Sequence, residues 1–161
     1  MFDFPDPVNE VAARVVACGV LLMSAATLLM SLTAGAAWLW ATALIAYGFV
    51  ARVLTGPTLS PLGRFATSVV APKLGRARPV PGPPKRFAQA IGAVVTVGAV
   101  GFVAAGQADV ARGLLGVMIV AAGLEGFLAL CVGCKVYGVL IRTGIVREAA
   151  CPACADIGLH V

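Results

Sequence analysis

Four long runs of apolar residues, nearly free of charge, constrain what this chain can fold into. They cover residues 11–32, 37–54, 87–105 and 110–131. Each is close to the length of about 20 residues that an α-helix needs to cross the hydrocarbon core of a bilayer. Hydrophobic residues make up 60% of the chain and charged residues only 12%, which is typical of membrane proteins. We therefore predict an all-α fold, an integral membrane four-helix bundle that forms a single domain over residues 1–161.

The segment between the second and third runs, residues 55–86, differs in composition because it holds most of the prolines and basic residues. Ser60-Pro61 predicts the start of a short helix there, since serine is a favoured N-cap and proline is favoured at the first helical position. Apolar residues then recur at helical spacing from Leu62 to Val70. This helix fits either an amphipathic helix on the membrane surface or a loop helix packed over the bundle. Residues 76–84 are expected to form an extended, polyproline-like connector.

Basic residues predict the orientation of the chain, because loops rich in Lys and Arg stay on the cytoplasmic side. Only Arg112 lies near either of the two short turns. Apart from Arg14 in the first run, the others gather in or beside the central loop and after the fourth run: Arg52, Arg64, Lys73, Arg76, Arg78, Lys85, Arg86, Lys135, Arg142 and Arg147. We therefore expect a multi-pass protein with the central loop, both termini and the tail of residues 143–161 in the cytoplasm.

Two CxxC pairs carry the clearest chemical signal. Cys131-Val-Gly-Cys134 ends the fourth run and Cys151-Pro-Ala-Cys154 follows in the tail, which gives the spacing C-x2-C-x16-C-x2-C. Such thiols can exchange disulfides or sulfur, bind a metal, or simply pack in a core. A shared tetrathiolate site would take zinc or iron and would need the intervening residues to turn back. In a relay, the tail pair would instead exchange with the membrane pair through a mixed disulfide.

The position of the first pair weighs on its reactivity. If the fourth helix continues through Cys131, the pair lies at a helix C-terminal end, where the helix dipole disfavours a thiolate. A regular helix also keeps the two Cβ atoms about 5–6 Å apart, whereas a disulfide needs about 3.8 Å. Gly133 is the point at which the helix could loosen, and the positive charge of Lys135 favours the thiolate.

Two further residues inside the apolar runs are candidates. Glu125 is ionisable within a membrane helix, where such residues are costly and therefore often functional. The alternative is a neutral, hydrogen-bonded acid that holds helices together. On an unbroken helix it would lie about 120° around the axis from Cys131, which makes it a poor direct base. Cys18 could approach the Cys131 pair at similar depth or serve as a small buried hydrophobe.

Several stretches together carry a family resemblance: Ala51-Arg-Val-Leu-Thr-Gly-Pro57, Pro81-Gly-Pro-Pro-Lys-Arg-Phe-Ala-Gln89, Cys131-Val-Gly-Cys-Lys-Val-Tyr137 and Cys151-Pro-Ala-Cys-Ala-Asp-Ile157. Over nearly its whole length the chain resembles a bacterial family of four-helix membrane proteins known only as a domain of unknown function. The CxGC-x-x-Tyr element is its most specific part. The chain is also similar to DoxX-type small membrane proteins, which are linked to thiol and sulfur redox. These resemblances imply a bacterial plasma membrane and a thioredoxin-like or sulfurtransferase partner.

The resulting hypothesis is a membrane thiol-redox or sulfur-handling protein, a candidate thiol–disulfide oxidoreductase. Cys131 and Cys134 would exchange electrons or sulfane sulfur, Cys151 and Cys154 would pass them to the soluble partner, and Glu125 would assist proton movement. The alternative is a zinc- or iron-binding membrane adaptor without catalysis, or a subunit of a homo-oligomer or larger membrane complex. No motif identifies a quinone site. The net charge of +5 comes without any nucleic-acid-binding motif, so we expect no nucleic-acid partner.

Overall fold

The computed structural model describes residues 6–74 and 78–145 of the chain. Four helical stretches in it are long and apolar enough to cross a membrane: Glu10–Thr33, Ala36–Thr55, Gly82–Ala104 and Ala108–Leu128. They correspond to α1 (Glu10–Thr33), to the 3-10 helix η1 (Ala36–Ala41) continued by α2 (Thr42–Thr55), to α4 (Gly82–Ala104) and to α5 (Ala108–Leu128). The prediction of a mostly helical chain with four candidate membrane helices is therefore confirmed.

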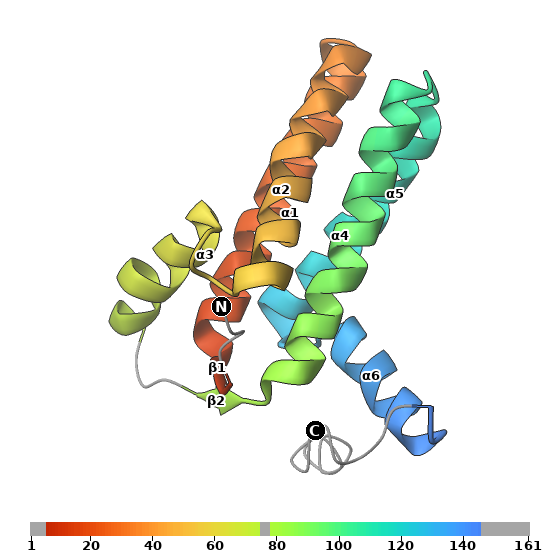
Figure 1. Cartoon of the computed structure of the whole chain (residues 1–161). Helices are drawn as coiled ribbons and strands as arrows, with labels where there is room; N and C mark the ends of the chain where they lie inside the picture. The colour runs from red at the N-terminus through yellow and green to blue at the C-terminus, as the bar shows by residue number, and fades with distance from the viewer. Residues whose placement is uncertain (1–5, 75–77, 146–161) are drawn as a thin grey trace.

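The long helices lie side by side, with α1 against α5, α2 against α4 and α4 against α5 (Figure 1). α1 and α4 begin, and α2 and α5 finish, at the same end of the molecule, which is drawn at the bottom of Figure 1 and is called the lower end here. A short antiparallel pair, β1 (Val8–Asn9) with β2 (Pro79–Val80), lies at this end. The helices α3 (Pro61–Phe65) and α6 (Val132–Arg142) flank it.

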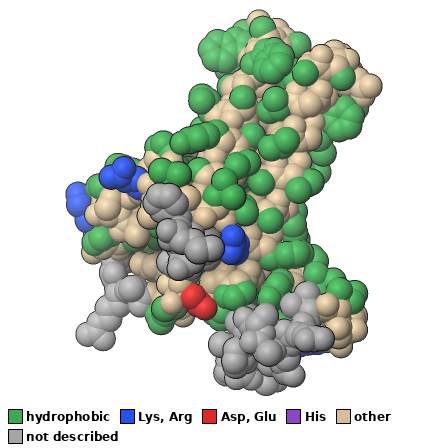
Figure 2. Space-filling model, in the orientation of Figure 1, with side chains coloured by type: hydrophobic (Ala, Val, Ile, Leu, Met, Phe, Trp, Pro, Cys, Tyr) green, Lys and Arg blue, Asp and Glu red, His purple; other side chains and the backbone are tan. Residues whose placement is uncertain are grey.

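Small residues let the long helices approach one another closely. Gly92 of α4 lies against the ring of Phe49 of α2, where an added Cβ would come within 2.3 Å of a ring carbon. Lipid is as apolar as the helix surfaces, so the hydrophobic effect does not drive membrane helices together. Close packing of their backbones stabilises their association instead. The outward faces carry exposed Leu, Val and Phe side chains, and on the face in Figure 2 these cover the long helices while Lys and Arg gather toward the lower end. This surface suits contact with a lipid bilayer.

The loop helix predicted from Ser60-Pro61 is present. α3 starts at Pro61 with Ser60 as its N-cap, whose Oγ accepts the N–H of Gly63 at 3.2 Å. It continues as a π-helix, η2 (Ala66–Val70), and a 3-10 turn, η3 (Ala71–Lys73). Leu62 packs on Gly19 of α1, where an added Cβ would come within 2.7 Å of the leucine side chain. This contact favours the packed loop helix of the two alternatives.

The polyproline-like connector expected over residues 76–84 is wrong for its second half. Pro79–Val80 form β2, and α4 begins at Gly82 and not at Phe87. Pro83 and Pro84 fall in the first turn of α4, where a backbone N–H has no intrahelical acceptor, so prolines cost nothing there. The membrane helix therefore includes Lys85, which the sequence assigned to a polar loop.

The fourth helix also ends earlier than predicted, at Leu128 and not at Cys131. Ala129 has a φ of 54°, in the left-handed region that terminates helices. The N–H of Leu130 then returns to the carbonyl of Leu124 at 3.1 Å, which closes the end of α5. α6 follows as a separate helix from Val132, with Cys131 as its N-cap. The fourth helix therefore does not continue through Cys131.

Candidate dithiol site

Cys131 and Cys134 occupy the N-terminal end of α6. Cys131 has an extended backbone, and its Sγ accepts the backbone N–H of Cys134 at 3.4 Å, in the manner of an N-cap side chain. Both cysteines are free thiols, Cys131 buried and Cys134 half-buried. The positive end of a helix dipole faces Cys131 and favours its thiolate. The predicted placement at a helix C-terminal end is therefore reversed, and the objection to a disulfide from an unbroken helix no longer applies.

α6 is held on the first turns of α4 by two contacts. Gly133 lies directly against the backbone of Ala88, where an added Cβ would come within 2.6 Å of the Ala88 Cα. One turn further, Tyr137 packs on Phe87 with ring centroids 5.4 Å apart and planes tilted by 51°. Tyr137 is buried, so its role is packing between helices. These contacts fix the position of the dithiol relative to α4.

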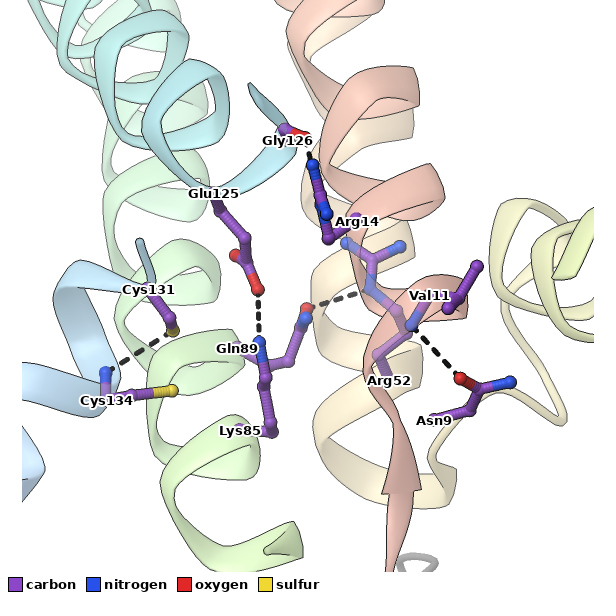
Figure 3. A network of polar contacts seen from close by, with 10 residues as sticks. All are labelled: Asn9, Val11, Arg14, Arg52, Lys85, Gln89, Glu125, Gly126, Cys131 and Cys134. Carbon is purple, nitrogen blue, oxygen red and sulfur yellow. Dashed lines mark hydrogen bonds and ion pairs between the residues drawn. The ribbon is translucent and has the colours of Figure 1, made fainter. Parts of the chain in front are cut away.

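A buried ion pair lies beside the dithiol. Nζ of Lys85 on α4 is 2.7 Å from Oε1 of Glu125 on α5, and the two side chains are only 10% and 18% exposed. The partner of Glu125 is thus the side chain of Lys85, from the neighbouring helix α4. Figure 3 shows the sulfur atoms of Cys131 and Cys134 pointing toward this pair. Glu125, which an unbroken helix would have turned away from Cys131, lies near it because the chain bends at Ala129.

The two thiols differ in acidity. The hydrogen bond from the Cys134 thiol, helped by the charge of Lys85, lowers the pKa of Cys131 against the opposing effects of burial and Glu125. The same thiol hydrogen bond, with burial next in importance, raises the pKa of Cys134. Cys131 is therefore the thiol that ionises first, and Cys134 is the proton donor of the pair.

This asymmetry predicts how the thiols react with iodoacetamide. We expect Cys131 to be alkylated before Cys134, with a reaction midpoint below the pKa of about 8.5 of a free cysteine. In a Cys134→Ala variant the midpoint for Cys131 should move to higher pH, because the thiol hydrogen bond that stabilises its thiolate is gone. Mass spectrometry of protein alkylated between pH 5 and 10 would measure both midpoints. Equal midpoints for the two cysteines would contradict the assignment.

The dithiol is open to the outside through a surface pocket of about 370 Å³, called the outer pocket here. Its walls include Cys131, Cys134, Lys85, the exposed Lys135 and Glu10. The pocket leaves the pair partly open, as reactive cysteines are, and Lys135 adds a positive charge beside it. A soluble thiol or disulfide can therefore reach the pair from this side.

Two arginines hold the lower end together, and the sequence offered one of them, Arg52, only as an orientation signal. Arg52 of α2 is 5% exposed; its Nε donates to Gln89 at 2.8 Å and its Nη1 to Ser60 at 3.1 Å. Arg14 of α1 donates to the carbonyls of Gly126 and Phe127 at the end of α5. Only one feature of the sequence pointed to the polar contacts around Gln89. Lys85 and Gln89 are four residues apart, so they would have been placed on one helix face had the start of α4 been known.

Of the three remaining cysteines, the structure describes only Cys18. Cys18 packs against Gly126 of α5, and it lines a different pocket from that of Cys131 and Cys134, so the packing role fits it better. Cys151 and Cys154 lie outside the described residues, and the tetrathiolate and relay hypotheses therefore stay predictions. Within residues 6–74 and 78–145, no three His, Cys, Asp or Glu side chains are grouped closely enough to hold a metal ion.

Comparison with protein families adds one finding. Residues 8–142 match the model of the family described as "Domain of unknown function (DUF4395)". The chain belongs to the DUF4395 family. The comparison with curated proteins found no match, and the comparison with solved structures found none. The DUF4395 match runs from β1 to the end of α6, so it includes the Cys131–Cys134 pair and ends before Cys151. The resemblance to a family of unknown function is confirmed, whereas the DoxX-type likeness stays a prediction.

Proposed function

We propose that this DUF4395 protein is a membrane thiol–disulfide exchange protein, with Cys131 as the attacking thiol and Cys134 as the resolving thiol. The observation that carries the proposal is the position of Cys131 as N-cap of α6, where its Sγ accepts the Cys134 N–H at 3.4 Å. A CxxC pair in the first turn of a helix combines a stabilised thiolate with a second thiol within reach. The outer pocket gives a soluble partner access to both.

The exchange proceeds in two balanced steps. The Cys131 thiolate attacks a disulfide of the partner, forms a mixed disulfide and releases one partner thiolate. Cys134 then gives up its proton and attacks the Cys131 sulfur, which yields the Cys131–Cys134 disulfide and the second partner thiol. Two electrons pass to the partner, and a reduced partner drives the same steps in reverse. Glu125, ion-paired with Lys85 beside the thiols, is the group we propose for moving the Cys134 proton.

We also propose that the four long helices form a transmembrane bundle with the lower end in the cytoplasm. The described basic side chains support this orientation, because Arg112 near the start of α5 is at the opposite end from the cluster formed by α3, the start of α4 and α6. In this orientation the outer pocket opens toward the cytoplasm. Thioredoxin-like or sulfurtransferase proteins are then the partners that can reach Cys131.

Single-cysteine variants test the exchange. A Cys134→Ser variant should trap a mixed disulfide between Cys131 and an oxidised thioredoxin-like protein, because the resolving thiol is missing. A Cys131→Ser variant should form none, and the double variant should lose exchange altogether. A Cys18→Ser variant is the matched control and should exchange like the wild type. Non-reducing electrophoresis and mass spectrometry would identify the product. Undiminished exchange by the double variant would refute the assignment.

The metal and sulfur contents of the same samples distinguish the exchange proposal from a metal-binding adaptor and from transfer of sulfane sulfur. Stoichiometric zinc or iron that is lost on replacing any one of Cys131, Cys134, Cys151 and Cys154 would indicate a tetrathiolate adaptor in place of an exchange protein. A stable mass gain of one sulfur atom on Cys131 after incubation with a sulfurtransferase would indicate transfer of sulfane sulfur. The exchange proposal expects neither.

A further inference from the structure

Cys131 lies in the wall between two separate spaces. One is the outer pocket, which Cys134 also lines. The other is a cavity of about 180 Å³ among α1, α4 and α5, called the inner cavity here, whose walls include Cys131 but not Cys134. The Lys85–Glu125 pair also lies between the two spaces, because Lys85 lines the outer pocket and Glu125 lines the inner cavity. The dithiol and the ion pair therefore connect a pocket that has charged side chains in its walls with a more apolar cavity.

The inner cavity is apolar except at its lower end. Val16, Val20 and Met118 line its upper part, and the polar groups Gln89, Glu125 and Cys131 are in its walls near the lower end. Arginine is a donor only, so the group of Gln89 that accepts from Arg52 at 2.8 Å must be Oε1. The amide Nε2 is thereby left as a donor of Gln89, which lines both the inner cavity and a neighbouring pocket beside Arg52.

The inner cavity reaches the outer surface of the long helices. Ile91 and Val117 are in its walls and are also 39% and 57% exposed. They lie on α4 and α5, on the apolar surface that suits contact with lipid. A molecule dissolved in the bilayer could therefore enter beside Val117 without passing through water.

We propose that the inner cavity binds the ring of a membrane quinone, which accepts the two electrons of the Cys131–Cys134 dithiol. This inference rests on the proposed exchange function and names its second substrate. A dry cavity of about 150 Å³ holds a benzene ring, so a volume of about 180 Å³ suits a benzoquinone ring. Apolar walls cover the ring faces and the Gln89 amide donates to a carbonyl oxygen. The isoprenoid tail leaves between α4 and α5 into lipid.

The redox step balances without a further reactant. Two S–H bonds break and one S–S bond forms between Cys131 and Cys134, while the quinone gains two electrons and two protons and becomes a hydroquinone. Cys131 lines the inner cavity, so one of the two residues that are oxidised is beside the ring. Lys85 and Glu125, 2.7 Å apart, bridge the two spaces and can carry protons from the outer pocket to the quinone oxygens.

The test uses the full-length protein in lipid nanodiscs, fully reduced and without oxygen, with a decyl-substituted benzoquinone as the probe. We expect one equivalent of hydroquinone to form, measured by absorbance, together with loss of the two thiols, measured by alkylation and mass spectrometry. Val117→Trp should obstruct the mouth of the cavity and slow this reaction by about tenfold or more, in line with the sensitivity of apolar pockets to steric change. Val120→Trp is the matched control: it is 63% exposed on the same helix, outside the cavity walls, and should react like the wild type.

Two further measurements distinguish a failure of the quinone inference from a failure of the proposed exchange function. Ala121→Leu fills the cavity from inside and should slow the quinone reaction as Val117→Trp does, while exchange with a soluble thioredoxin-like protein stays at the wild-type rate. Exchange without hydroquinone formation would overturn the quinone inference and leave the exchange function standing. Equal quinone rates in Val117→Trp and Val120→Trp would overturn the cavity as the site. Loss of exchange in the wild type would instead refute the proposed function itself.

Discussion

Replacing Lys85 with methionine should lower the free energy of unfolding by about 3–5 kcal/mol, because the carboxylate of Glu125 would remain buried without a partner. The ion pair is the 2.7 Å contact between α4 and α5 at the lower end, and neither side chain is more than 18% exposed. Denaturation of the protein in mixed detergent micelles, followed by circular dichroism, would measure the loss. The variant should also show a higher midpoint pH for alkylation of Cys131, since Lys85 is one of the groups that lower the pKa of that thiol.

Two controls separate the buried charge from other effects of the substitution. Lys73→Met removes an exposed lysine and should change stability by less than about 0.5 kcal/mol. The double variant Lys85→Met/Glu125→Leu replaces the whole pair with apolar groups and should recover most of the lost stability, because no unpaired charge is left. A single variant as stable as Lys73→Met would mean that the pair contributes nothing to the contact between α4 and α5.

Much of the fold could be predicted because membrane helices are recognised by length and hydropathy alone. The errors lie where a helix boundary depends on more than composition. Pro83 and Pro84 look like helix breakers, but they are tolerated at a helix start, so α4 begins five residues before Phe87. Ala129 is an ordinary helix former, yet it has a φ of 54° and ends α5. The alanine side chain gives no sign of that conformation, which occurs where the chain turns from α5 to α6 and α6 packs on α4.

The same two boundary errors explain what the sequence could and could not reveal about the site. Cys131, Cys134 and Glu125 were identifiable because thiol pairs and intramembrane acids stand out by type. Lys85 was not, since its role depends on lying inside α4, opposite Glu125. The direction of the helix dipole at Cys131 was predicted with the wrong sign, because a helix end and a helix start look identical when the break between them is invisible. Cys151 and Cys154 lie outside the described residues, so their part stays a prediction.

Gly133→Ala should detach the dithiol from α4 and cost about 1–3 kcal/mol of stability, which is the usual cost of overpacking. An added Cβ would come within 2.6 Å of both Cα and Cβ of Ala88, and backbone atoms cannot move aside as a flexible side chain can. α6 must therefore shift away from α4 and carry Cys131 away from Lys85. We expect the Cys131 pKa to fall, because burial and Glu125, which raise it, outweigh Lys85, which lowers it. Alkylation as a function of pH would measure this change.

Gly138→Ala is the matched control in the same helix, because nothing lies within 4 Å of the position of its added Cβ. Both substitutions gain the same helix propensity of up to about 1 kcal/mol, so the difference between them isolates the contact with Ala88. If the close approach of Gly133 to α4 positions the dithiol, only Gly133→Ala should change the exchange rate and lower the alkylation midpoint of Cys131. Equal behaviour of the two variants would mean that α6 carries its reactive thiol without help from α4, and that the helix N-terminus alone sets the acidity of Cys131.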